Sequence, residues 1–289
     1  MNITASVVIP TYNRPQLAIK AAKIIRSFHS HIQITIVDQF GSSNIDLQQI
    51  NDFNLKYINL NVENTSIAKN RGIKESDGKI VFFFDDDLEI TKDTISEQLN
   101  AYTDPQVVAT SGRVINDGDT IPKDTQVSTG RMNGLGTKFT QRFWSTKEQI
   151  IDFPYGCNMS FRKSTLNSVK GFDERLPKIF EEIDLGKRVS SHGVIKFMPK
   201  ALAYHHKAPS GGTRQTKINH QKMLYRYYGY YLGKNITFPI SILSLMLRTK
   251  TVLTEAPFVV FNLYNGYIKG LLKITSSHAT TAGSSRMKP

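Results

Sequence analysis

Cysteine is almost absent from this chain of 289 residues, in which Cys157 is the only one. A single cysteine excludes a framework of internal disulfides and indicates a reducing compartment, so we expect a cytoplasmic protein. Residues 1–10 lack the basic segment that opens a secretory signal peptide. Long apolar runs are missing as well, because the longest, residues 236–247, is about half of the ~20 residues that a membrane-spanning helix needs.

Glycine-rich nucleotide-binding motifs are also missing. The chain contains neither G-x-G-x-x-G nor G-x-x-x-x-G-K-S/T, which argues against dinucleotide binding and against P-loop phosphoryl transfer. A nucleotidyltransferase on a similar sheet would carry phosphate-binding glycines near residues 10–15, and that segment has none. The sequence shows no internal repeat.

Acidic residues nearly disappear from the C-terminal third of the chain. From residue 196 onward there are 14 Lys and Arg and one acid, Glu255, whereas the first 195 residues hold 23 bases and 23 acids. The whole net charge of +13 therefore lies after residue 195. Such a block predicts an anionic partner, which would be lipid headgroups, nucleotide phosphates or nucleic acid. A solvated basic face without a partner is the alternative.

Apolar periodicity predicts alternating strands and helices over the first part of the chain. A β-branched strand is expected at residues 6–9, and we expect Pro10 to end it. Strands separated by helices predict an α/β fold with a mainly parallel sheet flanked by helices. The further strands are expected at 34–37, 57–60 and 80–84, and the helices at 16–28 and 66–75.

Three adjacent carboxylates, Asp85, Asp86 and Asp87, follow directly on the apolar strand at 80–84. They repel one another, so their position predicts a ligand that favours concentrated negative charge. Mg²⁺ or Mn²⁺ is the simplest candidate, because hard oxygen ligands suit both ions, and a solvated turn is the alternative. Asp38 follows the strand at 34–37 in the same way, so both sites are expected along one sheet edge, where a nucleotide would bind.

Several segments follow one another in a familiar order. They are residues 7–15 (VVIPTYNRP), 36–38 (IVD), 85–87 (DDD), 156–162 (GCNMSFR) with 171–174 (GFDE), 180–188 (FEEIDLGKR) and 199–205 (PKALAYH). Each is weak alone, but the ordered series resembles the inverting family 2 glycosyltransferases of GT-A fold. The resemblance covers about residues 5–207 and implies a Rossmann-like nucleotide-binding sheet.

The resemblance implies transfer of a sugar from a nucleotide diphosphate, with UDP as the expected nucleotide, to a hydroxyl of a glycan or lipid-linked acceptor in cell-surface polysaccharide synthesis. The metal ligands that it implies, for Mn²⁺ or Mg²⁺, are Asp85, Asp87 and His205. It places Gly156, Cys157 and Asn158 on the acceptor side. The donor-binding residues that it implies are Pro10, Thr11, Tyr12, Asn13, Arg14, Asp38, Lys69, Asn70, Arg71, Asp85, Asp86 and Arg214.

The acidic segment at 180–188 is implied to supply the catalytic base, which takes the proton of the acceptor hydroxyl as it attacks the sugar. Glu182 stands where the family usually has Asp, and Glu181 and Asp184 remain rivals. If the segment is helical, Glu181 and Asp184 share a face while Glu182 points elsewhere. An exposed acidic first turn of a helix is the alternative.

Two adjacent histidines, His205 and His206, close the late strand. Neighbouring strand residues face opposite ways, so at most one of them reaches a metal, and the spacing from Pro199 favours His205. Two surface histidines in a basic loop are the alternative. Beyond them, residues 210–214 are glycine-rich and end in Arg214, which suits a lid over the diphosphate.

The sequence does not decide which partner the basic C-terminal region binds. Apolar runs at 236–247 and 258–267 are edged by bases, which suits helices lying on the anionic inner face of the cytoplasmic membrane. A helical subdomain that packs on the catalytic core or on a second subunit is the alternative. Tyrosines interleaved with bases at 225–231 suggest nucleic-acid binding as a second function class. That class leaves the acidic triplet unexplained and lacks a recognisable module, so we expect no nucleic-acid partner.

These patterns divide the chain into three regions. The catalytic domain is expected at 1–207, with a nucleotide-binding half at 1–88 and an acceptor half at 89–207 that includes a loop-rich insertion between 116 and 136. A basic helical region is expected at 208–275. Residues 276–289 are small and polar, which predicts a disordered tail.

Overall fold

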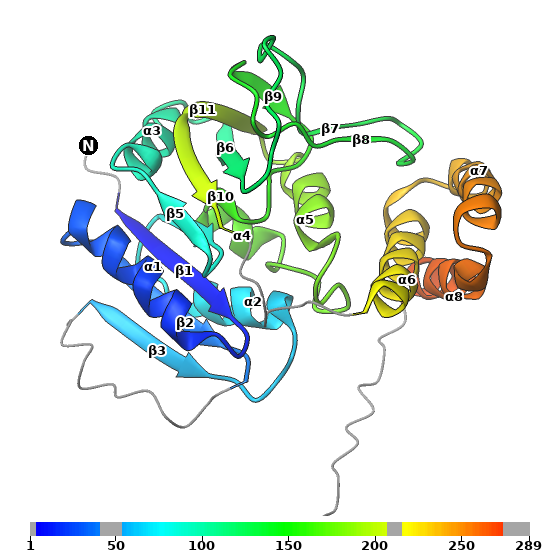
Figure 1. The fold of residues 1–289 in the computed structure, drawn as a ribbon, viewed down its shortest axis with the longest axis horizontal. Coiled ribbons are helices and arrows are strands. Elements are labelled where there is room, and N and C mark those ends of the chain that lie inside the picture. The colour runs from blue at the N-terminus through cyan, green and yellow to red at the C-terminus, as the bar shows by residue number, and fades with distance from the viewer. Residues whose placement is uncertain (1–3, 41–53, 207–215, 274–289) are drawn as a thin grey trace, which may run out of the picture.

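A computed structural model describes residues 4–40, 54–206 and 216–273 of the chain. Its main feature is a nine-stranded sheet in the order β3-β2-β1-β4-β10-β6-β11-β5, with β9 paired to β11 (Figure 1). Helices cover both faces of this sheet, and three more helices form a layer beside it. The expected α/β fold is confirmed.

The first half of the sheet is parallel, as the sequence predicts. Its strands are β1 (Ala5–Thr11), β2 (Gln33–Asp38), β3 (Leu55–Asn59) and β4 (Ile80–Phe84), and β1 lies between β2 and β4. Successive residues of β1 face opposite sides of the sheet. Val7 and Ile9 join the buried cluster under α1 (Pro15–Phe28), and Val8 joins the cluster under α2 (Thr65–Glu75).

Pro10 does not end the first strand, which was the expectation from sequence. Strand β1 continues to Thr11, and Pro10 pairs with Val37 of β2. On its other side β1 pairs with β4 only as far as Val8. Beyond that point one side of β1 is unpaired, so a residue without an N–H donor fits there.

The second half of the sheet contains antiparallel neighbours. Strand β10 (Asn158–Arg162) runs antiparallel between β4 and β6 (Val107–Asn116), and β11 (Val194–His205) is parallel to β6. The short strands β5 (Leu88–Ile90) and β9 (Gln149–Ile151) pair antiparallel with β11. Strands β1, β2, β3, β4, β6 and β11 thus point one way and β5, β9 and β10 the other, so the sheet is mixed but mainly parallel.

Helix α3 (Thr94–Ala101) lies with α1 on one face of the sheet, and α4 (Lys163–Ser168) and α5 (Glu181–Val189) lie with α2 on the other. The predicted loop-rich insertion is largely irregular, and near its end β7 (Arg131–Met132) forms a small hairpin with β8 (Phe139–Thr140). The tail at 276–289 lies outside the described residues.

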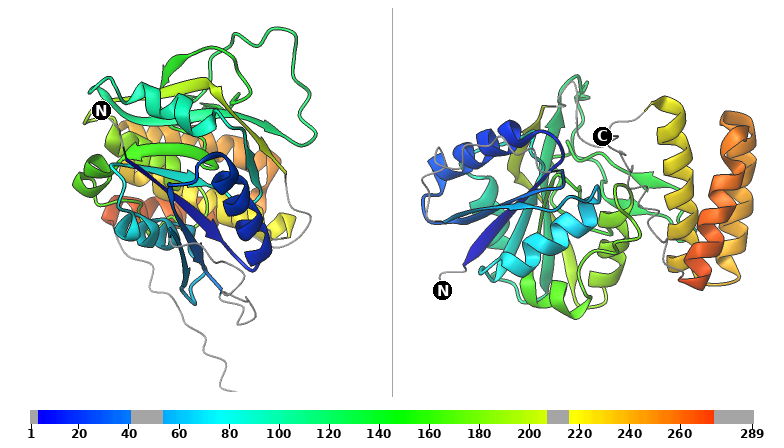
Figure 2. Two further views of the ribbon diagram at one scale, coloured as in Figure 1. Left: turned by 90° about the vertical axis from the view of Figure 1, so that its left-hand side faces the viewer. Right: turned by 90° about the horizontal axis from the view of Figure 1, so that it is seen from below.

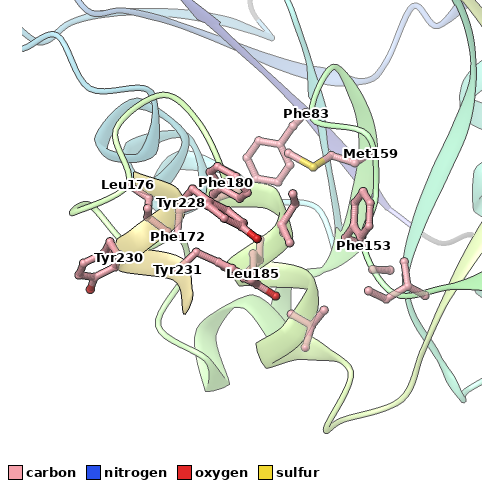
Figure 3. Close-up of a cluster of buried hydrophobic side chains, with 14 of the residues drawn as sticks. Phe83, Phe153, Met159, Phe172, Leu176, Phe180, Leu185, Tyr228, Tyr230 and Tyr231 are labelled. Atoms are coloured by element: carbon pink, nitrogen blue, oxygen red, sulfur yellow. The ribbon is translucent and has the colours of Figure 1, made fainter. Parts of the chain in front are cut away.

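The C-terminal helices are α6 (Lys217–Asn235), α7 (Ile240–Glu255), the short η2 (Pro257–Val259) and α8 (Val260–Leu272). Figures 1 and 2 show them as a layer beside α5. Tyr228 and Tyr231 of α6 lie against Phe180 in the same buried cluster as Phe83 of β4 (Figure 3). One core therefore continues from the sheet into the C-terminal region. Among the described residues, none of the helices combines the length and the apolarity that crossing a membrane requires.

Candidate active site

The candidate site lies at the edge where the parallel strands end. Thr11 closes β1, Asp85 follows β4, and His205 closes β11. Strand β10 runs the other way, so the residues just before it, Gly156 and Cys157, reach the same edge. Their side chains and backbone line a cavity of about 260 Å³. Open α/β sheets generally bind ligands at this edge.

Two carboxylates and an imidazole converge at this edge. One ligand atom each from Asp85, Asp87 and His205 lies within 4.8 Å of the others. The Nε2 of His205 is 3.0 Å from Oδ1 of Asp87, and its Nδ1 is 3.0 Å from Oδ1 of Asn116, which orients the ring. His206 faces away, with Nδ1 3.1 Å from Asp117 Oδ1. The alternation of a strand separates the two histidines, as the sequence analysis expects.

The middle acid of the triplet, Asp86, is held by the turn after β1. Arg14 donates through Nη2 to Asp86 Oδ1 at 2.5 Å and through Nη1 to Asp87 Oδ2 at 3.1 Å. The hydroxyl of Thr11 donates to Asp86 Oδ2 at 2.6 Å. Asn13 adopts a positive φ of 55° in this turn, a conformation that Asn tolerates better than most residues. The turn is therefore fixed to the triplet by charged hydrogen bonds.

A lysine and two glutamates also line the cavity. Lys69 of α2 is 2% exposed, and its Nζ donates to Glu181 Oε1 at 3.0 Å. Glu182 lines the same cavity beside Gly156. Burial, together with the neighbouring Glu181 carboxylate, raises the pKa of Glu182 well above its usual range, although Lys69 opposes the shift. Glu181 is therefore the partner of Lys69, and Glu182 is the carboxylate whose pKa burial raises.

Helix α5 begins in a way that brings both glutamates to the cavity. Phe180 precedes the helix with a φ of 69°, in the left-handed region that costs a non-glycine residue about 1–2 kcal/mol. Its ring stacks on Tyr231, with centroids 5.7 Å apart, and lies 5.4 Å from the ring of Tyr228 (Figure 3). The expectation that Glu182 points away from Glu181 was wrong, because both stand in the first turn of α5, which faces the cavity.

Comparison with known proteins identifies the family. The sequence model described as Glycosyl transferase family 2 matches residues 6–169, more than half of the chain. The chain belongs to glycosyl transferase family 2.

The curated relatives are distant, and each match covers only part of both proteins. An uncharacterized glycosyltransferase of Rickettsia conorii is 27% identical over 197 residues, which are 60% of this chain and 32% of that protein. A putative colanic acid biosynthesis glycosyl transferase, WcaA, of Escherichia coli is 35% identical over 33% of this chain and 36% of its own length. An N-acetylglucosaminyl-diphospho-decaprenol L-rhamnosyltransferase of Mycobacterium tuberculosis is 33% identical over 28% of this chain and 26% of its own. The matched segments thus span only about a third of these relatives.

Solved structures share the GT-A-like fold. The S. aureus TarS fragment 1–349 in complex with UDP-GlcNAc has a TM-score of 0.61 at 16% identity, and the likeness covers 93% of this chain and 82% of that one. GalNAc-T7 with UDP, GalNAc and Mn²⁺ has a TM-score of 0.59 at 16% identity, covering 91% of this chain and 58% of that one. At this identity the likeness concerns the fold.

Several residues that the family resemblance implied lie away from the cavity. Asp184 points from α5 toward α6, where its Oδ1 accepts from Lys234 at 2.5 Å and its Oδ2 from Arg188 at 2.8 Å. Asn70 binds the backbone of Phe172 instead of facing the cavity, donating through Nδ2 to its carbonyl at 3.0 Å. Packing between helices determines which way the side chains of Asp184 and Asn70 point. The order of the motifs in the sequence does not reveal that direction.

Three further implied residues serve the framework. Arg71 is exposed and pairs with Glu75 one turn along α2, at 3.0 Å. Asp38 is fully buried, accepting from the Tyr57 hydroxyl at 2.7 Å and from the Phe40 N–H at 3.0 Å. Asn158 lies inside the core, where its Oδ1 accepts from Gln98 at 2.8 Å. Asn13 shapes the turn without lining the cavity, and Arg214 falls outside the described residues.

Some cavity residues carry no motif that sequence reasoning could use. They reach the cavity from the ends of strands and from the segment before α5, next to motif residues. The only sequence signals that could have indicated them are the adjacent motif residues Asp38, Gly156 and Phe180. The residues missed in this way are Gln39, Thr65, Tyr155, Lys178 and Ile179.

Proposed function

We propose that the chain transfers a sugar from a nucleotide diphosphate, UDP, to a hydroxyl of a glycan or lipid-linked acceptor, with inversion at the anomeric carbon. The observation that carries the proposal is one cavity lined both by Asp85 and His205, which cluster with Asp87, and by Glu182, whose pKa is raised. The TarS structure with UDP-GlcNAc supports UDP as the nucleotide.

The acidic cluster fits a divalent cation. Two carboxylates and one imidazole within 4.8 Å offer oxygen and nitrogen donors that suit Mn²⁺, and the carboxylates suit Mg²⁺. Asn116 holds the His205 ring through Nδ1, which leaves Nε2 directed at Asp87. A cation held here supplies positive charge that stabilises the departing diphosphate. The Mn²⁺ of the GalNAc-T7 structure supports this reading.

Glu182 is the base in this proposal. Its raised pKa makes it a better proton acceptor than an exposed glutamate, and its carboxylate lines the cavity. Lys69 holds Glu181 and so keeps a second negative charge beside Glu182 without competing for the acceptor. When Glu182 takes the hydroxyl proton, the acceptor oxygen attacks the sugar directly. Such a displacement inverts the anomeric carbon and needs no covalent intermediate.

The names of two relatives support the acceptor class. WcaA is described as a colanic acid biosynthesis enzyme, and the mycobacterial relative as a transferase acting on a diphospho-decaprenol. We infer from these names that the chain works in cell-surface polysaccharide synthesis on a glycan or lipid-linked acceptor.

We propose further that α7 and α8 rest on an anionic membrane surface. Large apolar side chains are exposed on α7 at positions 242, 243, 246, 247 and 253, which share one face of the helix. On α8, Phe261 is 77% exposed, with positions 264, 268, 271 and 272 on the same face. Residues 216–273 hold eight bases and one acid, which complements anionic lipid and disfavours pairing of two such surfaces.

Four of the five tyrosines that suggested nucleic-acid binding do not favour that alternative. Tyr225, Tyr228, Tyr230 and Tyr231 are all buried, between 0% and 5% exposed, so they are not presented for stacking on bases.

The donor and cofactor proposals are tested together by thermal shift. We expect UDP to raise the melting temperature when Mn²⁺ is present and not without it, since a ligand that binds the folded state stabilises it. Asp87→Asn removes one ligand charge and should abolish the Mn²⁺-dependent shift. Asp77→Asn, at a residue remote from the cavity, is the matched control. A shift that needs no metal, or that survives in Asp87→Asn, contradicts the cation site.

A further inference from the structure

A second cavity, of about 330 Å³, lies between α5, β8 and the C-terminal helices. Glu182 and Ile179 line both this cavity and the one that Asp85 and His205 line. Phe180, Tyr225, Tyr228 and Arg248 form its other walls. We call it the α6–α7 cavity. Its volume lies near the lower end of the range for small-molecule sites.

Arg248 is the charged group that the C-terminal helices contribute to this cavity. Its guanidinium lies over the rings of Tyr225 and Tyr228, at 5.4 and 5.1 Å from their centroids, which holds the planar group in place. Its Nε is buried and has no hydrogen-bond partner. Among the described residues, Arg248 forms no ion pair with a carboxylate, and Glu255 accepts instead from the Tyr225 hydroxyl at 3.5 Å.

Arg248 lines the cavity and has no carboxylate partner among the described residues, so the cavity favours a ligand that supplies an oxygen acceptor. The planar guanidinium matches the two oxygens of a phosphate or carboxylate. Since Glu182 lines both cavities, a hydroxyl of a molecule bound in the α6–α7 cavity lies next to the proposed base.

We infer that the α6–α7 cavity binds the acceptor by an anionic group, with Arg248 as the residue that recognises it. The inference rests on the proposed function, because it takes Glu182 as the base. The anion is either a phosphate of a lipid-linked acceptor or the carboxylate of an acidic sugar. Arg248 is thus a specificity-determining residue, and it lies on α7 in the C-terminal helical layer.

The test uses full-length protein saturated with UDP and Mn²⁺, so that the first cavity is occupied. Three probes are titrated in a thermal-shift assay: citronellyl diphosphate, methyl glucuronide and neutral methyl glucoside. We expect one of the anionic probes to stabilise the wild type and the neutral probe not to. The diphosphate alone would identify a phosphate, and the glucuronide alone a carboxylate.

Arg248→Met keeps most of the length of the side chain but removes its charge. We therefore expect this variant to bind the anionic probe about tenfold more weakly, or weaker still. Arg248→Lys keeps the charge without the fork and should be intermediate. Lys250→Met removes an exposed base of the same helix and should behave as wild type. Variants are compared only where their melting temperature without ligand matches wild type, and Arg248→Lys serves if Arg248→Met does not fold.

The inference is overturned if neither anionic probe stabilises the wild type, or if the shift is as large in both Arg248 variants. Failure of the proposed function is a separate result. It appears when UDP and Mn²⁺ do not change the melting temperature. Methyl glucuronide carries no diphosphate, so in that case its effect on the melting temperature still shows whether Arg248 binds an anion.

Discussion

Lys69 and Glu181 form a buried ion pair, with Nζ 3.0 Å from Oε1, and this pair separates the roles of the acids in α5. Glu181 is neutralised by Lys69, Asp184 is bound by Lys234 and Arg188, and Glu182 alone of the three presents a carboxylate to both cavities. The three neighbouring acids should therefore respond differently to the same conservative change.

Glu182→Gln should lower kcat by about 10²- to 10⁴-fold, because the amide cannot accept the acceptor's proton, with little change in melting temperature. Asp184→Asn should instead destabilise the fold, by up to about 3 kcal/mol, since it removes the buried charge that the half-buried Lys234 and Arg188 share. Turnover of UDP-sugars and thermal unfolding of both variants check this. A stable Asp184→Asn enzyme with lost turnover would move the base to Asp184.

Asp173 binds Tyr230 and Lys234 of α6, and low pH should weaken these contacts. Burial would raise the pKa of this carboxyl, but hydrogen bonds from Arg175 and the charge of Lys234 outweigh burial and hold the pKa far below its usual range. A lowered folded pKa contributes stability that is fully present above the unfolded value of about 3.9 and is lost as the pH falls below it. Asp173→Asn should therefore be less stable than wild type at pH 7.

The measurement is the difference in unfolding free energy between wild type and Asp173→Asn from pH 7 to pH 3. We expect a gap of about 1–3 kcal/mol at pH 7, typical of hydrogen bonds to charged groups. The gap should narrow steadily below about pH 4. Asp77→Asn, at a surface carboxyl, controls for general acid effects. A gap of constant size at every pH would show that the charge of Asp173 does not stabilise the fold.

The exposed apolar faces of α7 and α8 should bind membranes. The intact protein should float with vesicles containing anionic lipid and not with neutral vesicles, because apolar burial and charge attraction act together. A Met246→Ser, Phe261→Ser double variant should lose flotation. Phe28→Ser, which changes an exposed apolar residue of α1, is the matched control. A stable dimer in light scattering, with no flotation, would assign these faces to a second copy of the chain.

The fold could be predicted largely from sequence because its signals are local. The apolar strand at 80–84 was placed to the residue, and the helices α1 and α2 within one residue at each end. The acidic cluster was also predictable, since parallel strands bring Asp85 and the end of β11 to one edge. Pro10 was misjudged because the sequence does not tell on which side β1 loses its neighbour.

The site was less predictable where packing decides the direction of a side chain. Asn70 and Arg71 follow Lys69 in the motif, yet only Lys69 faces the cavity, because successive residues of α2 point in different directions. Asp184 turns toward Lys234, a residue some fifty positions later, and no local pattern announces that contact. The tyrosines of α6 looked available for stacking, and their burial is visible only in three dimensions.

The left-handed backbone of Phe180 has a consequence for protein engineering. Tyr228 and Tyr231 hold its ring in place from α6, and the two residues that follow it are the glutamates of the cavity wall. A chimera that joins residues 1–207 of this chain to another protein's ending would keep every motif of the catalytic domain, yet lose the two tyrosines that hold the ring of Phe180 next to the proposed base. Chimeras between such enzymes should therefore place their crossover beyond Asn235, so that Tyr228 and Tyr231 stay in the same chain as Phe180.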